Sequence, residues 1–346
     1  MLKRHAWIIG YFIVSLSACD SDNRSLPSAI ALEGKTMGTS WHVSIASGTP
    51  VHLNTLRQII QQTLDNEDRQ LSTWKPDSML SRFNRQQSSA PWPVSEAISD
   101  IVIRSLRIGA KTEGAMDITV GPLVNLWGFG PDKQPLKTPT PAQIAAARAK
   151  TGLQHLRVIN DSRGQWLQKD VPELYLDLST VGEGYAADSV AHLLEQEGFQ
   201  NYLVSVGGAV TSRGVRADGK PWRVAIQKPT DQENAAQAVV TLNGQGISTS
   251  GSYRNYYELD GQRLSHVIDP RTGAPIRHKL VSATVIARDA LEADAWDTGL
   301  MVLGPEEARA LALKENLAVY LIIKEAHGFS VWASPGFKPF LLNKTN

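Results

Sequence analysis

The spacing of apolar side chains predicts helices in the first part of the chain. Residues 53–71 carry Leu and Ile at every third or fourth position, which is the period of a helix with one buried face. Residues 95–114 repeat this spacing behind a Ser cap and end at a Gly. Residues 140–152 begin with Thr as cap and Pro in the first turn, and they end at a Gly. Residues 40–46 alternate instead, which predicts a strand with one buried face.

Short segments rich in β-branched residues dominate the second half of the chain. A helix at 184–198 and another that contains residues 291–300 lie among them. Because strands and helices do not alternate strictly, we expect an α+β fold rather than a doubly wound sheet. Six segments are bounded by turn residues and predict strands: 173–179, 202–208, 222–227, 238–242, 280–287 and 317–323.

Length and composition indicate a globular protein with a sizeable core. The chain has 346 residues, of which 42% are apolar and 20% charged. At about 150 residues per domain, two lobes are expected, and the polar turn at 161–165 favours a division into mixed α/β lobes of 32–165 and 166–340. A net charge of +1 with scattered charges gives no reason to expect a nucleic-acid partner.

The N-terminus has the pattern of a bacterial lipoprotein signal. Lys3 and Arg4 precede an apolar run at 6–18 that is too short to span a membrane. The run ends at "LSAC", which resembles a lipobox and makes Cys19, the single cysteine, the expected lipidation site. A plain cleaved signal with a coincidental cysteine is the alternative. We therefore expect a signal peptide over 1–18, a polar tether over 19–31 and folded sequence from residue 32.

The residue after that cysteine bears on location. In enterobacterial lipoproteins an Asp at this position, here Asp20, is associated with retention at the inner membrane. The lipid chains would supply stable attachment. We expect a protein anchored at the periplasmic face of the inner membrane.

Three oxygen-bearing side chains share one face of the helix around 291–300. Asp294, Asp297 and Thr298 stand at i, i+3 and i+4 among apolar residues, and no Lys or Arg lies between 289 and 308. Two buried carboxylates repel one another, and a divalent ion such as Mg²⁺ or Ca²⁺ removes that penalty. A merely solvated helix face is the alternative. Glu292 follows Asp289 at capping-box spacing and has a structural role.

Two further polar stretches are candidates for the same chemistry. In residues 175–188 a predicted strand ends at Asp177 and a Gly-rich turn opens a helix, which suits a phosphate, although on this segment alone an ordinary strand–turn–helix with capping residues is favoured. Neither a Walker loop nor a GxGxxG motif is present. In residues 251–275, Arg254 and Arg271 could meet an anion, and His266 could accept a proton at neutral pH or make only a structural hydrogen bond.

Seven stretches of the chain form a pattern together: 36–39, 72–84, 114–130, 176–188, 204–208, 251–273 and 292–305. Taken together in this order, they resemble the ApbE family of FAD:protein FMN transferases. The resemblance implies one ApbE-like catalytic unit over 32–340, with an FAD and metal cleft between its lobes. Members transfer the FMN part of FAD to a Thr or Ser hydroxyl of a target protein, release AMP and require Mg²⁺. Targets are typically subunits of membrane redox complexes that carry a short flavinylation motif.

The resemblance also implies roles for individual residues. His266 would help to deprotonate the acceptor hydroxyl. Thr180 would offer its backbone carbonyl to the metal, beside Asp294, Asp297 and Thr298. Glu183 occupies a cofactor-binding position where many relatives have Lys, so we expect no direct phosphate contact from it. The remaining FAD-binding positions are Met37, Trp74, Ala115, Met116, Asp117, Asp177 and Ile268.

Two other functions remain compatible with the sequence. The same site could hydrolyse FAD to FMN and AMP with water as acceptor. A lipoprotein that only binds flavin is the second alternative, although a binder has no need of acids that converge on a metal.

Overall fold

The computed structural model describes residues 28–48, 52–132, 134–230, 235–253 and 255–342. Within these ranges, no helix has both the length and the apolar character needed to cross a membrane. The predicted signal peptide and Cys19 lie outside the described residues.

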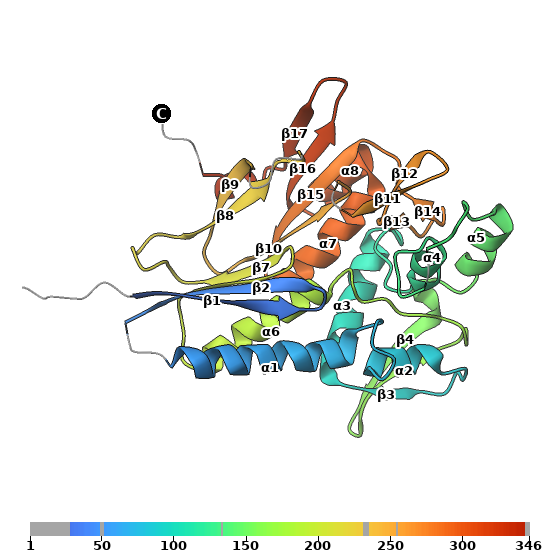
Figure 1. The fold of residues 1–346 in the computed structure, drawn as a ribbon, viewed down its shortest axis with the longest axis horizontal. Coiled ribbons are helices and arrows are strands. Elements are labelled where there is room, and N and C mark those ends of the chain that lie inside the picture. Colours follow the sequence, from blue (N-terminus) through green and yellow to red (C-terminus); the bar gives the residue numbers. More distant parts are fainter. Residues whose placement is uncertain (1–27, 49–51, 133, 231–234, 254, 343–346) are drawn as a thin grey trace, which may run out of the picture.

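An eight-stranded sheet forms the centre of the protein (Figure 1). Every pair of neighbouring strands is antiparallel. In order across the sheet the strands are β1 (Ser28–Thr36), β2 (Thr39–Ser47), β6 (Tyr202–Val206), β7 (Ala209–Arg213), β10 (Gly246–Gly251), β15 (Leu280–Ala287), β16 (Ala318–Lys324) and β17 (Phe329–Ala333).

Different elements pack on the two faces of this sheet. Helices α1 (Leu53–Leu71), α6 (Gly182–Gln196) and α7 (Ala290–Leu303) lie on one face, and the hairpin of β8 (Trp222–Gln227) and β9 (Ala236–Leu242) lies on the other (Figure 1). Side chains alternate along each strand, so neighbouring residues serve different faces. In β10, Ile247 packs against the β8–β9 side while Ser248 points to α7.

A second group of elements packs beside α7. Helix α3 contacts α7 directly and also touches the small sheet β3-β5-β4. The bounds of these and the remaining elements are α2 (Met79–Arg85), β3 (Trp92–Val94), α3 (Glu96–Lys111), α4 (Gly121–Leu126), α5 (Pro141–Arg148), the 3₁₀ turn Leu153–His155, β4 (Leu156–Asp161), β5 (Gly164–Lys169), β11 (Tyr256–Leu259), β12 (Gln262–Ser265), β13 (Ile268–Asp269), β14 (Ala274–Pro275) and α8 (Pro305–Lys314). The 3₁₀ turn Lys338–Phe340 contacts β9 instead.

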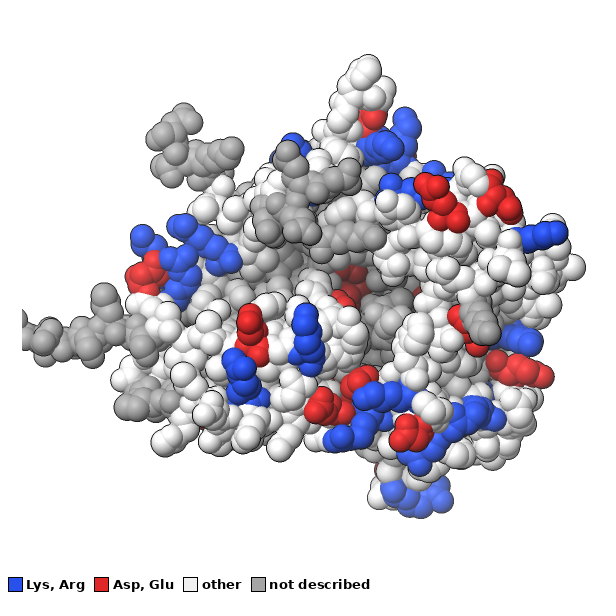
Figure 2. All heavy atoms as spheres, viewed as in Figure 1, with Lys and Arg blue, Asp and Glu red and all other residues white. Residues whose placement is uncertain are grey.

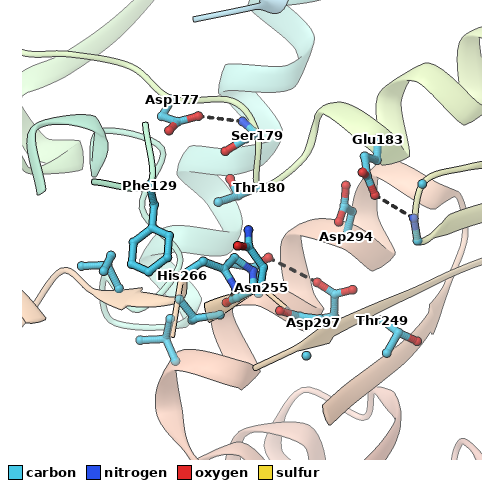
Figure 3. Close-up of a pocket in the computed structure, with 18 of the residues that line it drawn as sticks. Phe129, Asp177, Ser179, Thr180, Glu183, Thr249, Asn255, His266, Asp294 and Asp297 are labelled. Atoms are coloured by element: carbon cyan, nitrogen blue, oxygen red, sulfur yellow. Dashed lines mark hydrogen bonds between the residues drawn. The ribbon is translucent and has the colours of Figure 1, made fainter. Parts of the chain in front are cut away.

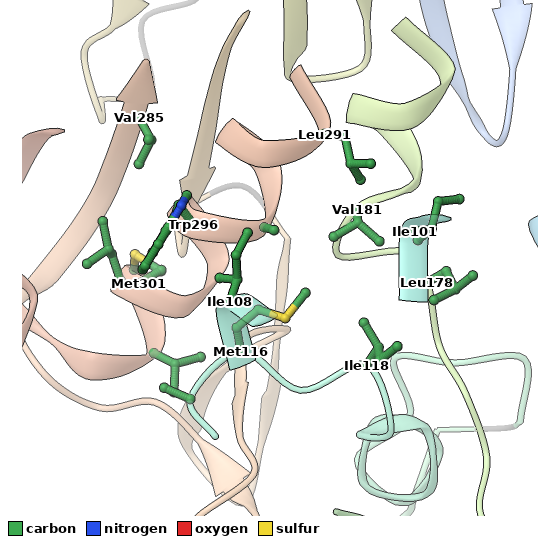
Figure 4. Close-up of a cluster of buried hydrophobic side chains, with 14 of the residues drawn as sticks. Ile101, Ile108, Met116, Ile118, Leu178, Val181, Val285, Leu291, Trp296 and Met301 are labelled. Atoms are coloured by element: carbon green, nitrogen blue, oxygen red, sulfur yellow. The ribbon is translucent and has the colours of Figure 1, made fainter. Parts of the chain in front are cut away.

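The largest apolar cluster joins the segments that carry the candidate site (Figure 4). Ile108 of α3, Met116 and Leu178 of two loops, and Trp296 and Met301 of α7 are all less than 4% exposed in this cluster. Burying large side chains of this kind stabilises a fold by about 1.5–3 kcal/mol each. The loops are thus fixed to α7 by the core itself.

The structure confirms the α+β class and the five predicted helices, which are α1, α3, α5, α6 and α7. Helix α1 has the predicted bounds, Ser95 caps α3, and Thr140 forms a capping box at α5 with Gln143. At α7 the Asp289 carboxylate caps the Glu292 N–H as predicted.

The predicted strand at 173–179 is wrong. The Asn84 amide takes the place of a neighbouring strand, donating to the Leu176 carbonyl at 2.8 Å and accepting from its N–H at 2.8 Å. The Asp177 N–H bonds to the Ile118 carbonyl, also without a strand ladder. The turn at 161–165 connects β4 to β5, so residue 165 lies within a strand; the division into lobes stays a prediction.

Candidate functional site

A cavity of about 930 Å³ opens beside α7 (Figure 3). Its walls come from the β1–β2 turn, the loops before and after α4, the loop that leads into α6, the β6–β7 turn, β8, β10 and α7. In the space-filling view, a hollow near the middle of the face contains acidic atoms (Figure 2). Twelve of the residues predicted for the site line it: Met37, Trp74, Ala115, Asp117, Asp177, Thr180, Glu183, His266, Ile268, Asp294, Asp297 and Thr298.

Helix α7 places two carboxylates in the cavity wall. The Asp294 carboxylate accepts the Gly184 N–H at 2.9 Å through Oδ2 and the Ser248 hydroxyl at 3.2 Å through Oδ1. Asp297 is 1% exposed, and its Oδ2 has no hydrogen-bond partner. Burial raises the pKa of both carboxyls well above the ordinary value, and repulsion from Glu183 and Asp294 adds to the rise.

The negative charge of the cavity has no cation opposite it among the described lining residues. These include five carboxylates, at 117, 177, 183, 294 and 297, and no Lys or Arg. Arg104 and Arg107 of α3 do reach α7, but they pair with Asp289 and Glu292 at its outer end. A ligand with phosphate groups would therefore need a cation that it brings with it.

The loop between Asp177 and α6 brings further oxygen atoms to the acids. The Asp177 carboxylate accepts the Ser179 N–H at 3.0 Å, which fixes the turn. Thr180 Oγ1 is buried in the cavity wall without a hydrogen-bond partner. Two buried oxygens, Thr180 Oγ1 and Asp297 Oδ2, are thus unsatisfied, although buried polar atoms are nearly always bonded.

The oxygen atoms of these side chains fit as ligands of a hard divalent cation. Mg²⁺ is typically bound by one or two carboxylates together with neutral oxygens and water. No group of three or more His, Cys, Asp or Glu side chains stands ready as a metal cage within the described ranges. The fit therefore rests on Asp294 and Asp297 with the oxygens of Thr180 and Thr298.

His266 approaches the cavity from the turn after β12. Its Nδ1 lies 2.9 Å from the Asn255 carbonyl oxygen, which can only accept, so Nδ1 carries the proton in the neutral ring. Nε2 is then free of a proton and can accept one. Burial lowers the pKa of the imidazole below 6.5, which keeps the ring neutral at neutral pH. The Phe129 ring meets it edge-on at 6.4 Å.

Glu183 makes a structural hydrogen bond at the cavity wall. Its Oε2 accepts the Gly208 N–H at 2.7 Å, which ties the start of α6 to the β6–β7 turn. Gly207 has a φ of +56°, and a Cβ there would overlap the Glu183 carboxylate. Only glycine suits that position.

Two predicted ligands have other positions. Met116 is 0% exposed and packs in the core, whereas its neighbours Ala115 and Asp117 line the cavity. Arg271 bonds to Asp269 and Glu307 at 3.0 and 3.1 Å and is absent from the cavity wall. Arg254 lies outside the described residues.

The sequence analysis missed much of the β-rich wall. Thr249 and Ser250 come from β10, which was not predicted, and Tyr253 and Asn255 follow it. The β-branched residues Ile247 and Thr249, between Gly246 and Gly251, are the signal that could have marked this strand. Residues 224–227 of β8 complete the wall.

Comparison with known proteins agrees with this architecture. The family model described as "ApbE family" matches residues 37–321. The chain belongs to the ApbE family. A protein named FAD:protein FMN transferase from Klebsiella pneumoniae strain 342 is 65% identical over 336 residues, which is 96% of each chain. One of the same name from Escherichia coli K12 is 67% identical over 315 residues, covering 91% of this chain and 90% of that protein.

Solved structures of ApbE proteins share the fold. The flavin transferase ApbE of Vibrio cholerae superposes with a TM-score of 0.83 at 42% identity, covering 91% of this chain and all of that one. The ApbE protein of Thermotoga maritima gives a TM-score of 0.80 at 26% identity over 91% of this chain and all of its own. The ApbE fold is therefore kept even at low identity.

Proposed function

We propose that this protein transfers the FMN moiety of FAD to a Thr or Ser hydroxyl of an acceptor protein, with Mg²⁺ as cofactor. Relatives across nearly the whole chain bear the name FAD:protein FMN transferase. The observation that carries the proposal is the acidic cavity with two unsatisfied oxygens, on Thr180 and Asp297. Its volume of about 930 Å³ is in the range of sites that enclose a large cofactor.

The chemistry is a phosphoryl-type transfer between two oxygens. The acceptor hydroxyl oxygen forms a bond to the phosphorus on the riboflavin side, and the bond from that phosphorus to the bridging oxygen breaks, so AMP leaves. His266 Nε2 takes the hydroxyl proton. Mg²⁺ bound at Asp294, Asp297, Thr180 and Thr298 would supply the positive charge that the pyrophosphate and the leaving AMP require.

The remaining cavity residues bind and orient FAD. Met37 stands at the tip of the β1–β2 turn with a φ of +48°, which is uncommon for a residue with a side chain and directs it to the cavity edge. Trp74 is 65% exposed at the rim, where it can stack on a flat ring. Ala115, Asp117, Asp177 and Ile268 line the interior.

Intact mass spectrometry of a small acceptor domain tests the proposal. The protein is incubated with FAD, Mg²⁺ and a domain that carries a Thr flavinylation motif. An FMN adduct that disappears with EDTA, or when the acceptor Thr is changed to Ala, is expected. Free AMP beside an unmodified acceptor would make the protein an FAD hydrolase instead, and neither product would leave a flavin binder.

We also propose that the acceptors are subunits of membrane redox complexes and that Cys19 carries a lipid at the periplasmic face of the inner membrane. The basis is the lipobox-like "LSAC" followed by Asp20. Labelling of cells with a fatty-acid analogue should mark the wild-type protein and leave Cys19→Ala unmarked. A Cys19→Ala protein that stays in the inner-membrane fraction after salt washing would contradict the anchor.

A further inference from the structure

Lys169 is a buried cation that the proposed chemistry does not use. It ends β5, is 1% exposed, and donates to the backbone carbonyls of Phe83, Asn84 and Leu174 at 3.3, 3.4 and 3.1 Å. Its ammonium also lies 5.0 Å from the centre of the Phe83 ring. A fully buried lysine is rare unless it is paired. Burial lowers the pKa of Lys169 to about 8, and the charge of Glu173 only partly opposes this shift. Burying this ammonium group costs folding free energy, so we expect Lys169 to have a specific role.

The carbonyls that Lys169 binds belong to two different segments of the chain. Phe83 and Asn84 are in the last turn of α2, where carbonyls carry partial negative charge, and the Phe83 carbonyl also accepts the Gln86 N–H. Leu174 begins the extended segment that leads to Asp177. The ammonium therefore joins the C-terminal end of α2 to that segment.

Asn84 makes a second connection between the same two elements. Its side chain brackets Leu176 with two hydrogen bonds of 2.8 Å, one to the carbonyl and one from the N–H. The Asp177 N–H bonds to Ile118 on the other side at 2.8 Å. Residues 174–177 belong to no strand, so these few bonds set the position of their backbone.

Both ends of this block reach the cavity. At the start of α2 the Ser78 hydroxyl donates to the Ser72 carbonyl at 2.6 Å, which fixes the loop that carries Trp74. At the other end, Thr180 follows Leu176 by four residues, a reach of at most about 13 Å even in extended chain. Asp177 and Thr180 line the cavity together with Trp74.

We propose that Lys169 and Asn84 are positioning residues for FAD, which lock helix α2 to residues 174–180 and so hold Trp74, Asp177 and Thr180 in one geometry. Neither residue is among those that line the cavity. The inference rests on the proposed function only in naming FAD as the ligand.

Direct FAD binding tests this without requiring transfer. Quenching of flavin fluorescence in the presence of Mg²⁺ gives the Kd of the full chain in detergent. Lys169→Met, which keeps the length of the side chain but donates nothing, and Asn84→Asp, which turns the donor toward Leu176 into an acceptor, should each raise the Kd for FAD by about tenfold or more. Because the two act as one unit, the double variant should be little worse than either alone.

Matched controls separate positioning from general loss of stability. Arg163→Ala, in the turn of the same hairpin and with a side chain 80% exposed, should leave the Kd unchanged. Phe337→Leu, fully buried in the cluster on the other face of the sheet, should lower the melting temperature and also leave the Kd unchanged. Lys169→Gln, which keeps a donor amide, carries the test if Lys169→Met does not fold, and an intermediate Kd is expected.

The outcomes distinguish this inference from the proposed function. A folded Lys169→Met protein and a folded Asn84→Asp protein that both bind FAD within twofold of wild type would overturn it. So would a weakening that Phe337→Leu matches at an equal loss of melting temperature. If wild type binds FAD but transfers nothing, the proposed function fails and the Kd comparison still decides the positioning role. Where transfer is observed, KM for FAD should change more than kcat.

Discussion

Gly184 lies where α6 and α7 approach most closely, and replacing it by Ala should displace one helix from the other. A Cβ at this position would be 2.5 Å from the Ala290 carbonyl oxygen and 2.8 Å from the Leu291 Cα. Ordinary contacts are about 3.5–4.0 Å, so the helices must part by roughly 1 Å. The alanine itself favours a helix by about 1 kcal/mol, while overpacking costs about 1–3 kcal/mol. We expect a net loss of up to about 2 kcal/mol in the free energy of unfolding.

The same displacement should reach the chemistry. The Gly184 N–H donates to Asp294 at 2.9 Å, so a shift of the helices separates the start of α6 from the carboxylate. Misplacement of a reacting group by about 1 Å can lower a rate by on the order of 10²-fold. We therefore expect transfer by Gly184→Ala to fall by tens of fold even at temperatures where the protein is folded.

Gly182→Ala is the matched control, since it lies in the same turn of α6 and its Cβ would meet nothing within 4 Å. It should be neutral or gain about 0.4–1 kcal/mol. Urea unfolding and the transfer rate are measured for both variants. Equal stability and equal activity of the two would refute the reasoning.

Three further predictions concern the cavity itself. In EDTA, Asp297→Asn should raise the melting temperature, because it removes one of two repelling buried carboxylates. The same variant should raise the Mg²⁺ concentration for half-maximal transfer by about tenfold or more. A lower melting temperature in EDTA would contradict the repulsion between the two carboxylates. The acid limb of the pH–rate profile should lie below pH 6.5, because burial lowers the pKa of His266 and only the neutral ring accepts a proton; the same limb in His266→Gln would remove the histidine from that role. Trp74→Ala should raise KM for FAD by roughly 5–100-fold without changing the free energy of unfolding, because the side chain is 65% exposed; an unchanged KM would exclude stacking.

Sequence patterns predict α7 and its acidic face well because both depend on one element. The cap at Asp289, the apolar positions and the i, i+3, i+4 spacing of Asp294, Asp297 and Thr298 all follow from a single helical period. The same holds for α3 and α5, whose Ser and Thr caps are local, and for α1, whose apolar period alone predicts it. The resemblance of seven motifs to the ApbE family is confirmed by the match over 37–321.

Sequence patterns of this kind do not predict features that depend on residues far away in the chain. Residues 173–179 have the composition of a strand, but their partner is a side chain 92 positions earlier in the chain. The acids at 289 and 292 find their arginines 185 positions away on α3. Met116 cannot be separated from Ala115 and Asp117 without knowing which way the loop turns, because all three suit the edge of a pocket.

Helix α7 serves the hydrophobic core with Trp296, Leu300 and Met301 and serves the cavity with its acids. A substitution on one side of this helix also affects the other side. Its sequence should therefore change slowly in evolution, and substitutions of its core residues should often lower the activity. Helix α5 stands at the opposite extreme, since none of its residues is buried. It is the element on which surface redesign, labelling or a fusion junction could be attempted with the least risk to either property.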